Sequence, residues 1–242
     1  MLDKKIRQVR IQDKEYPKLL KKIHNPPKVL YVRGKLSSQE KCFGIVGTRL
    51  CSAYGKQVAM EIATELAENG LTIVSGLAPG IDTAVHRAVV DQNKRTIAVV
   101  GTGVDEKSLY PKENIKLARE IIKNGGAIIS ELPPGTPGSK TTFPKRNRII
   151  SGLSLGILVV EAKQKSGALI TAEYAKKQGR KLFAIPGSIY SQNSRGCHFL
   201  IKKGAILTEN AQDILQALKI KIKKKKEEEI AWASLEEKLI LD

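Results

Sequence analysis

Short apolar runs alternate with amphipathic stretches along most of the chain. The runs are rich in β-branched residues and fall at 43–47, 71–75, 96–101, 126–130, 156–161 and 181–185. The stretches between them carry apolar residues at a spacing of three or four, which is the period of a helix packed on one side. This alternation predicts an α/β fold, with a Rossmann-like, doubly wound and mostly parallel sheet that has helices on both faces.

Two of the runs, at 97–100 and 157–160, are apolar at every position. A strand covered by helices on both faces has this pattern, so we expect both strands in the interior of the sheet. Between the first two runs, an i, i+4 stripe of Val58, Ile62 and Leu66 predicts a helix with one face on the sheet.

The segments on either side of this region differ from it in composition. Residues 1–40 are polar and rich in lysine, and they predict an N-terminal extension with a short helix followed by a strand. Residues 41–218 form the main Rossmann-like domain. Residues 219–242 begin with lysines and continue with glutamates, which is typical of a solvated linker and a short tail.

Charge narrows the class of function. The 242 residues include 42 Lys+Arg against 24 Asp+Glu, a formal net charge of +18. Such a protein attracts polyanions, most commonly nucleic acid, with an anionic membrane surface as the weaker alternative. No stretch approaches the roughly 20 apolar residues of a membrane span, and the charged N-terminus does not resemble a signal peptide. We therefore expect a cytoplasmic protein that does not contact membranes.

Ligands of doubly wound sheets bind beyond the carboxyl ends of the strands, so the residues there are the candidate site. Gly47, Thr48 and Arg49 follow the first strand and suit a phosphate group. Gly76 and Gly80 follow the second strand and permit close approach of backbone or ligand. Neither G-x-G-x-x-G nor the nucleoside-triphosphate loop is present, so we predict no nucleotide cofactor.

A cationic segment follows the fourth strand and a proline- and glycine-rich loop. The segment starts a predicted helix, whose positive end favours a bound anion. An aromatic ring beside arginines is typical of single-strand binding, by base stacking and phosphate contacts. At 100° per residue, Arg146 shares its side with Ile149 and Ile150, so we expect it to point toward the sheet. The site residues of this segment are Lys140, Phe143, Lys145, Arg146, Asn147 and Arg148, and Ser166 and Gly167 follow the fifth strand.

Five motifs in this order resemble the DNA-processing protein A (Smf) family. They are G-T-R at 47–49, S-G-L-A-x-G-I-D at 75–82, G-T-G-V-D with Y-P at 101–111, F-P-K-R-N-R at 143–148 and S-G-A-L-I-T-A at 166–172. The resemblance covers about residues 16–218.

The resemblance implies a homodimer that coats incoming single-stranded DNA in natural transformation and loads the RecA recombinase onto it. It also implies that the candidate residues, including the backbone at Gly80, line one phosphate-binding pocket. His198 stands where the family more often has Asn, and we assign it no role. Residues 227–242 look like only the start of the C-terminal winged helix that some members carry.

Three carboxylates, Asp82, Glu131 and Glu161, also follow predicted strands. They suit either acid–base catalysis or the orientation of the arginines at 49, 146 and 148, and we favour orientation. The three cysteines and three histidines show no metal-ligand spacing, so we predict reduced thiols and no metal.

The main alternative is a nucleotide phosphoribohydrolase of the lysine-decarboxylase-like type, which uses a related fold and a P-G-G-x-G-T-x-x-E signature. Here Ser166-Gly167 replaces the paired glycines. Glu173 follows Thr171 by two residues rather than three, which rotates the carboxylate by about 100° around a helix. We therefore predict no catalytic residues, and the remaining alternative is a scaffold whose charge only keeps it soluble.

Overall fold

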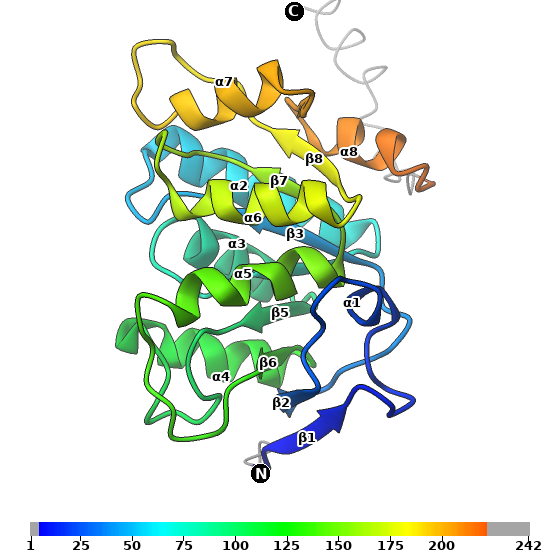
Figure 1. Cartoon of the computed structure of the whole chain (residues 1–242). Coiled ribbons are helices and arrows are strands. Elements are labelled where there is room, and N and C mark those ends of the chain that lie inside the picture. The colour runs from blue at the N-terminus through cyan, green and yellow to red at the C-terminus, as the bar shows by residue number, and fades with distance from the viewer. Residues whose placement is uncertain (1–4, 222–242) are drawn as a thin grey trace, which may run out of the picture.

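The computed structural model describes residues 5–221, and Figure 1 shows them as one sheet between two helical layers. The strands are β1 (Arg7–Arg10), β2 (Val29–Gly34), β3 (Cys42–Val46), β4 (Thr72–Ser75), β5 (Thr96–Val99), β6 (Ala127–Ser130), β7 (Ser154–Val159), β8 (Lys181–Ala184) and β9 (Ile206–Leu207). The helices are α1 (Lys18–Lys21), α2 (Ala53–Glu68), α3 (Ile81–Asp91), α4 (Ile115–Lys123), α5 (Thr142–Leu153), α6 (Gly167–Lys177), α7 (Arg195–Lys202) and α8 (Ala211–Ala217), with a 3-10 turn at Lys112–Asn114.

The sheet has the order β1-β2-β6-β5-β4-β3-β7-β8-β9. Strands β3 to β9 run parallel, and the order reverses at the neighbours β3 and β7. At such a switch point, the loops that leave the two strands turn to opposite faces and leave room for a ligand between them. The predicted fold class is therefore confirmed, and the fold places one obvious site beyond β3 and β7.

The six predicted strands are all present, and β5 and β7 each have neighbours on both sides. Two strands, β1 and β9, were not predicted. β1 has the mostly polar sequence R-Q-V-R, and β9 consists of only two residues, Ile206 and Leu207, so neither strand carries an apolar run long enough to predict it. The N-terminal segment has the predicted short helix and strand, and β2 pairs antiparallel with β6 in the same sheet.

Helices cover both faces of the sheet, as Figure 1 shows for α5 and α6 in front of it and α2 and α3 behind it. One core cluster joins α1, α5, α6 and α7 to the sheet, and the others join α2, α3, α4 and α8 to its opposite face. The predicted stripe on α2 packs as expected, because Ile62 and Leu66 are buried and Val58 is partly buried.

Among residues 5–221 no helix is long and apolar enough to cross a membrane. Within the same residues no group of three His, Cys, Asp or Glu side chains is placed to hold a metal ion. Residues 222–242, which contain most of the predicted Lys/Glu-rich tail, lie outside the described residues. The division of the chain at residues 41 and 219 remains a prediction.

Candidate nucleic-acid interface

A cleft of about 390 Å³ lies at the switch point, beyond the carboxyl ends of β3 and β7. Three segments supply most of its wall: the β3–α2 loop, the first turns of α5 and the β7–α6 loop. We call it the switch-point cleft. Of the site residues predicted from the sequence, the following line the wall: Gly47, Thr48, Arg49, Phe143, Arg146, Asn147, Ser166 and Gly167.

Backbone contacts hold the β3–α2 loop in place. The Thr48 amide donates to the carbonyl of Glu161 (2.8 Å), and the Thr48 carbonyl accepts from the Ile81 amide (3.2 Å). Gly80 has φ +79°, and a Cβ there would lie 2.4 Å from the Thr48 carbonyl oxygen. Gly80 is therefore needed behind the loop as packing, and its backbone is not part of the cleft wall.

Glu161 fixes the same loop from the other side. Its carboxylate accepts from the Ser52 hydroxyl (2.6 Å) and the Ser52 amide (2.9 Å). The Ser52 hydroxyl in turn accepts from the Gly55 amide and so caps α2. We expected Glu161 to orient an arginine, but its hydrogen bonds go to Ser52 and Asn193. It therefore positions the loop that carries Arg49.

Arg146 points from α5 toward the sheet, as predicted, and is buried. Its Nη1 donates to the Gly76 carbonyl (2.6 Å) and to the Val99 carbonyl, at the ends of β4 and β5. A Cβ at Gly76 would lie 2.5 Å from this nitrogen, so Gly76 makes room for the guanidinium rather than lining the cleft. The Nε of Arg146 has no hydrogen-bond partner among the described residues.

Arg146 stays positively charged although it is buried. Its pKa is lowered to about 10, mainly by desolvation; the carboxylate of Asp82 opposes this shift, and the charge of Arg49 adds to it. The guanidinium therefore stays protonated at neutral pH. Burial raises the pKa of Asp82, and Arg146 opposes that rise. Asp82 accepts from the Gly76 amide (3.1 Å) and the Ala78 amide (3.4 Å), and among the described residues it has no hydrogen bond to an arginine. The expected role of Asp82 in orienting an arginine therefore stays a prediction.

Arg49 and Phe143 meet at the rim of the cleft. The guanidinium carbon of Arg49 lies 5.6 Å from the centroid of the Phe143 ring, in cation–π range. Arg49 is exposed and Phe143 is partly buried. The rim thus presents an exposed cation and an aromatic ring together, above the buried charge of Arg146.

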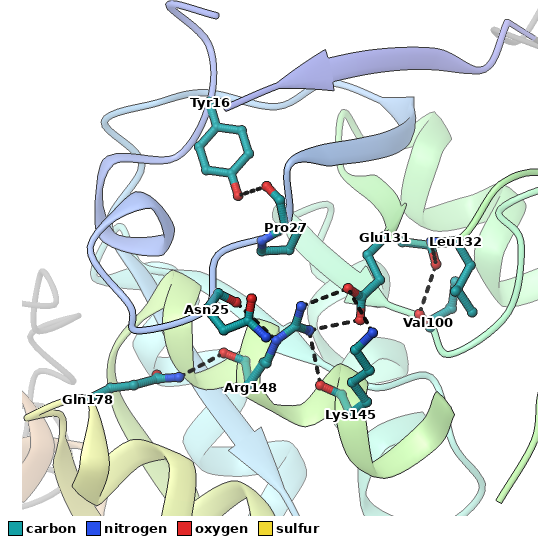
Figure 2. A network of polar contacts seen from close by, with 10 residues as sticks. Tyr16, Asn25, Pro27, Val100, Glu131, Leu132, Lys145, Arg148 and Gln178 are labelled. Atoms are coloured by element: carbon teal, nitrogen blue, oxygen red, sulfur yellow. Dashed lines mark hydrogen bonds and ion pairs between the residues drawn. The ribbon is translucent and has the colours of Figure 1, made fainter. Parts of the chain in front are cut away.

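Arg148 lies away from the cleft, at the centre of the network in Figure 2. Its two Nη atoms donate to the carboxylate of Glu131 (2.8 and 2.7 Å), and its Nε donates to the Asn25 carbonyl (3.1 Å). Two residues along a helix rotate a side chain by about 200°, so Arg146 and Arg148 must face opposite ways. The expectation that both line the pocket was wrong for Arg148. The orienting role expected of Glu131 is confirmed.

Of the other predicted residues, Lys140 lines a cavity beside the cleft and Lys145 does not line the cleft. Lys140 lines a neighbouring cavity that shares Arg49 and Phe143 with the cleft. Lys145 is exposed, lies outside the cleft wall, and has its ammonium 3.9 Å from Glu131. Lys163 and Lys165 line the cleft and were not predicted. The sequence does indicate them, because the two lysines of K-Q-K directly precede Ser166, the N-cap of α6.

The arrangement of carboxylates differs from that of the phosphoribohydrolase signature. Thr171 lines the cleft, whereas Glu173 is exposed and lies outside the wall. Asp82 is the one carboxylate among the described residues of the wall. Its hydrogen bonds go to backbone amides, so it is committed to the loop around Gly76.

The family model described as DNA recombination-mediator protein A matches residues 7–219. The chain belongs to this family. It is 45% identical over 215 residues to the DNA processing protein DprA of Bacillus subtilis, covering 88% of this chain and 71% of the relative. His198, the departure from the family pattern, has its Nε2 3.0 Å from the Gly187 carbonyl oxygen and does not line the cleft.

Two solved structures of the family share the fold. DNA processing protein A from Streptococcus pneumoniae superimposes with a TM-score of 0.82 at 44% identity, over 89% of this chain and 75% of that one. The protein from Helicobacter pylori gives a TM-score of 0.77 at 31% identity, over 90% and 98% of the two chains. The Helicobacter pylori structure gives insight into the single-stranded DNA binding mode of that protein.

We predict that Arg148→Ala lowers the free energy of unfolding by about 3 kcal/mol, because it leaves the half-buried Glu131 without its main partner. Urea unfolding followed by circular dichroism measures this loss. The control is Lys145→Ala on the same helix, which should change stability by less than about 0.5 kcal/mol, since its ion pair is exposed. Equal losses in the two variants would contradict the structural role of Arg148.

Proposed function

We propose that this protein binds single-stranded DNA in the switch-point cleft. The observation that carries the proposal is the rim pair of Arg49 and Phe143 above the buried, charged Arg146. A base can stack on Phe143 while phosphates approach the guanidinium groups, and this pairing of ring and charge is how single strands are held without sequence preference. The single-stranded DNA binding mode described for the Helicobacter pylori relative supports the proposal.

Several further groups favour an anion in the cleft. Lys163 and Lys165 line its wall beside the first turn of α6, whose backbone amides and dipole attract negative charge. Asn147 holds this turn by donating to the Gly167 carbonyl (3.2 Å). With a net charge of +18, the chain should bind DNA with a strong dependence on salt.

We propose that the protein acts without catalysing a reaction on the strand. The outward position of Glu173 supports this, because no second carboxylate joins Asp82 on the described wall of the cleft. Hydrolysis of a nucleotide by an acid–base pair would need one.

We predict that Arg49→Ala reduces affinity for labelled oligo-dT at least tenfold, because the rim cation and its contact with Phe143 are both lost. Phe143→Ala should lose about 1 to 3 kcal/mol of stacking. Fluorescence anisotropy across a salt series measures both, with duplex DNA and nucleoside monophosphates as competitors. Lys145→Ala, on the same helix but outside the cleft, is the matched control.

Poor competition by duplex DNA and a steep loss of affinity with salt would support the proposal. Wild-type affinity in both cleft variants would contradict it. Turnover of the monophosphates in place of binding would favour the phosphoribohydrolase.

We further propose that the bound strand is passed to RecA in natural transformation, the role that the family resemblance implies. The description of the family as recombination mediators supports this step. The lag before RecA hydrolyses ATP on oligo-dT should shorten when this protein is added, and Arg49→Ala should restore the lag. An unchanged lag with wild-type protein would contradict RecA loading.

We propose a homodimer that joins through the β9 edge of the sheet. Ile206 and Leu207 of β9 are exposed, as is Phe199 on the preceding helix α7, and β9 is the last strand of the sheet, with an edge that another strand or helix can cover. Leu207→Glu should therefore convert a dimer to a monomer in light scattering after size exclusion. Ile189→Glu, at an exposed apolar residue outside this patch, should leave the dimer intact. Equal masses for the two variants would contradict this surface.

A further inference from the structure

A second cavity shares a wall with the switch-point cleft. It has a volume of about 770 Å³ and lies between the turn at 107–112 and the loop at 135–140. Arg49, Phe143 and Pro144 line both spaces. A strand that leaves the cleft over Phe143 therefore enters this second space, which we call the loop cavity.

Tyr110 is the exposed aromatic residue of the loop cavity. Its side chain is 50% exposed, whereas its neighbours Leu109 and Pro111 are buried. Its ring centroid lies 5.9 Å from that of Phe143, and the two ring planes are tilted by 51°. An aromatic ring anchored on both sides yet open to solvent loses little conformational freedom when a base stacks on it.

Hydrogen bonds hold the two segments of this cavity together. The Asp105 carboxylate accepts from the Gly135 amide (2.7 Å) and from the Ser108 hydroxyl (2.8 Å). The Leu109 amide donates to the Asp105 carbonyl (3.1 Å), directly before Tyr110. The backbone directly before Tyr110 is thus held by the fold, and the contact of its ring with Phe143 places the ring beside the cleft.

The charge of the loop cavity suits a nucleic acid. Lys107, Lys112 and Lys140 join Arg49 on its wall, and no carboxylate lines it among the described residues. The cations can bind the phosphates of a nucleotide while the exposed ring stacks on its base, whereas an apolar ligand would make no use of the lysine charges.

We propose that Tyr110 is a second base-stacking platform and that the loop cavity holds the nucleotide next to the one on Phe143. This subsite rests on the proposed binding of single-stranded DNA in the cleft. Because the two rings are tilted by 51°, bases stacked on them are not parallel. The strand therefore bends between these two nucleotides, and the same bend in duplex DNA would require unpairing or unstacking of bases, which costs free energy.

A length series of oligo-dT, from the dinucleotide upward, tests this subsite by fluorescence anisotropy of the full chain. The wild-type protein should gain affinity at the length that first reaches the loop cavity. Tyr110→Ala should lose that gain, roughly 5- to 150-fold for one stacked base, and keep wild-type affinity for shorter oligonucleotides. Phe143→Ala should weaken every length.

Two further variants separate stacking from a merely structural role. Tyr110→Phe should keep the gain, and Tyr110→Trp should show fluorescence quenching that starts at the same length. Tyr190→Ala is the control, because Tyr190 is 89% exposed and lines neither cavity.

Equal weakening of all lengths by Tyr110→Ala would show that Tyr110 only supports Phe143 and would overturn the subsite. Wild-type affinities at all lengths in Tyr110→Ala would also overturn it, while leaving the proposed function intact. Failure of wild-type protein to bind any length would overturn the proposed function as well, so the two failures are distinguishable.

Discussion

Arg146 carries a full positive charge into a position almost closed to solvent, and the surrounding structure is arranged to hold it there. Its Nη1 joins the backbone ends of β4 and β5 through the Gly76 and Val99 carbonyls. A Cβ at Gly76 would lie 2.5 Å both from this nitrogen and from a carboxylate oxygen of Asp82, whose charge offsets part of the desolvation of Arg146. Burying a charge is unfavourable unless it is paired and hydrogen-bonded, so the residues around Arg146 cannot vary freely.

The rest of the candidate site follows from where the sheet reverses its strand order. Beyond β3 and β7 the loops diverge, and each loop is fixed by contacts of its own. Glu161 and Gly80 hold the β3–α2 loop from two sides, and Asn147 ties α5 to the start of α6. Arg49 and Phe143 therefore stand on a rigid rim. A rigid rim suits a ligand recognised by a ring and by charge rather than by base edges.

Much of the fold was predictable, because buried parallel strands are continuous apolar runs and the helices between them are amphipathic. The strands β1 and β9 were missed because β1 is mostly polar and β9 has only two residues, and pairing with β2 and β8 places them in the sheet. Helical periodicity located Arg146 correctly, and the same rule applied to Arg148 would have placed it on the opposite side. Its binding to Glu131 and to the Asn25 carbonyl depends on contacts far apart in sequence, which periodicity does not reveal.

Periodicity does not reveal the proximity of Tyr110 to Phe143 either. Thirty-three residues separate them, and their rings meet only because the loop after β5 lies beside the loop after β6 and the start of α5.

Hydrogen–deuterium exchange of the protein with and without oligo-dT tests most directly whether single-stranded DNA binds in the switch-point cleft, because it locates the bound strand without a mutation. We predict slower exchange in residues 47–50, 143–147 and 163–168, with β1 and α4 unchanged. Protection confined to residues outside the switch-point cleft would contradict the claim.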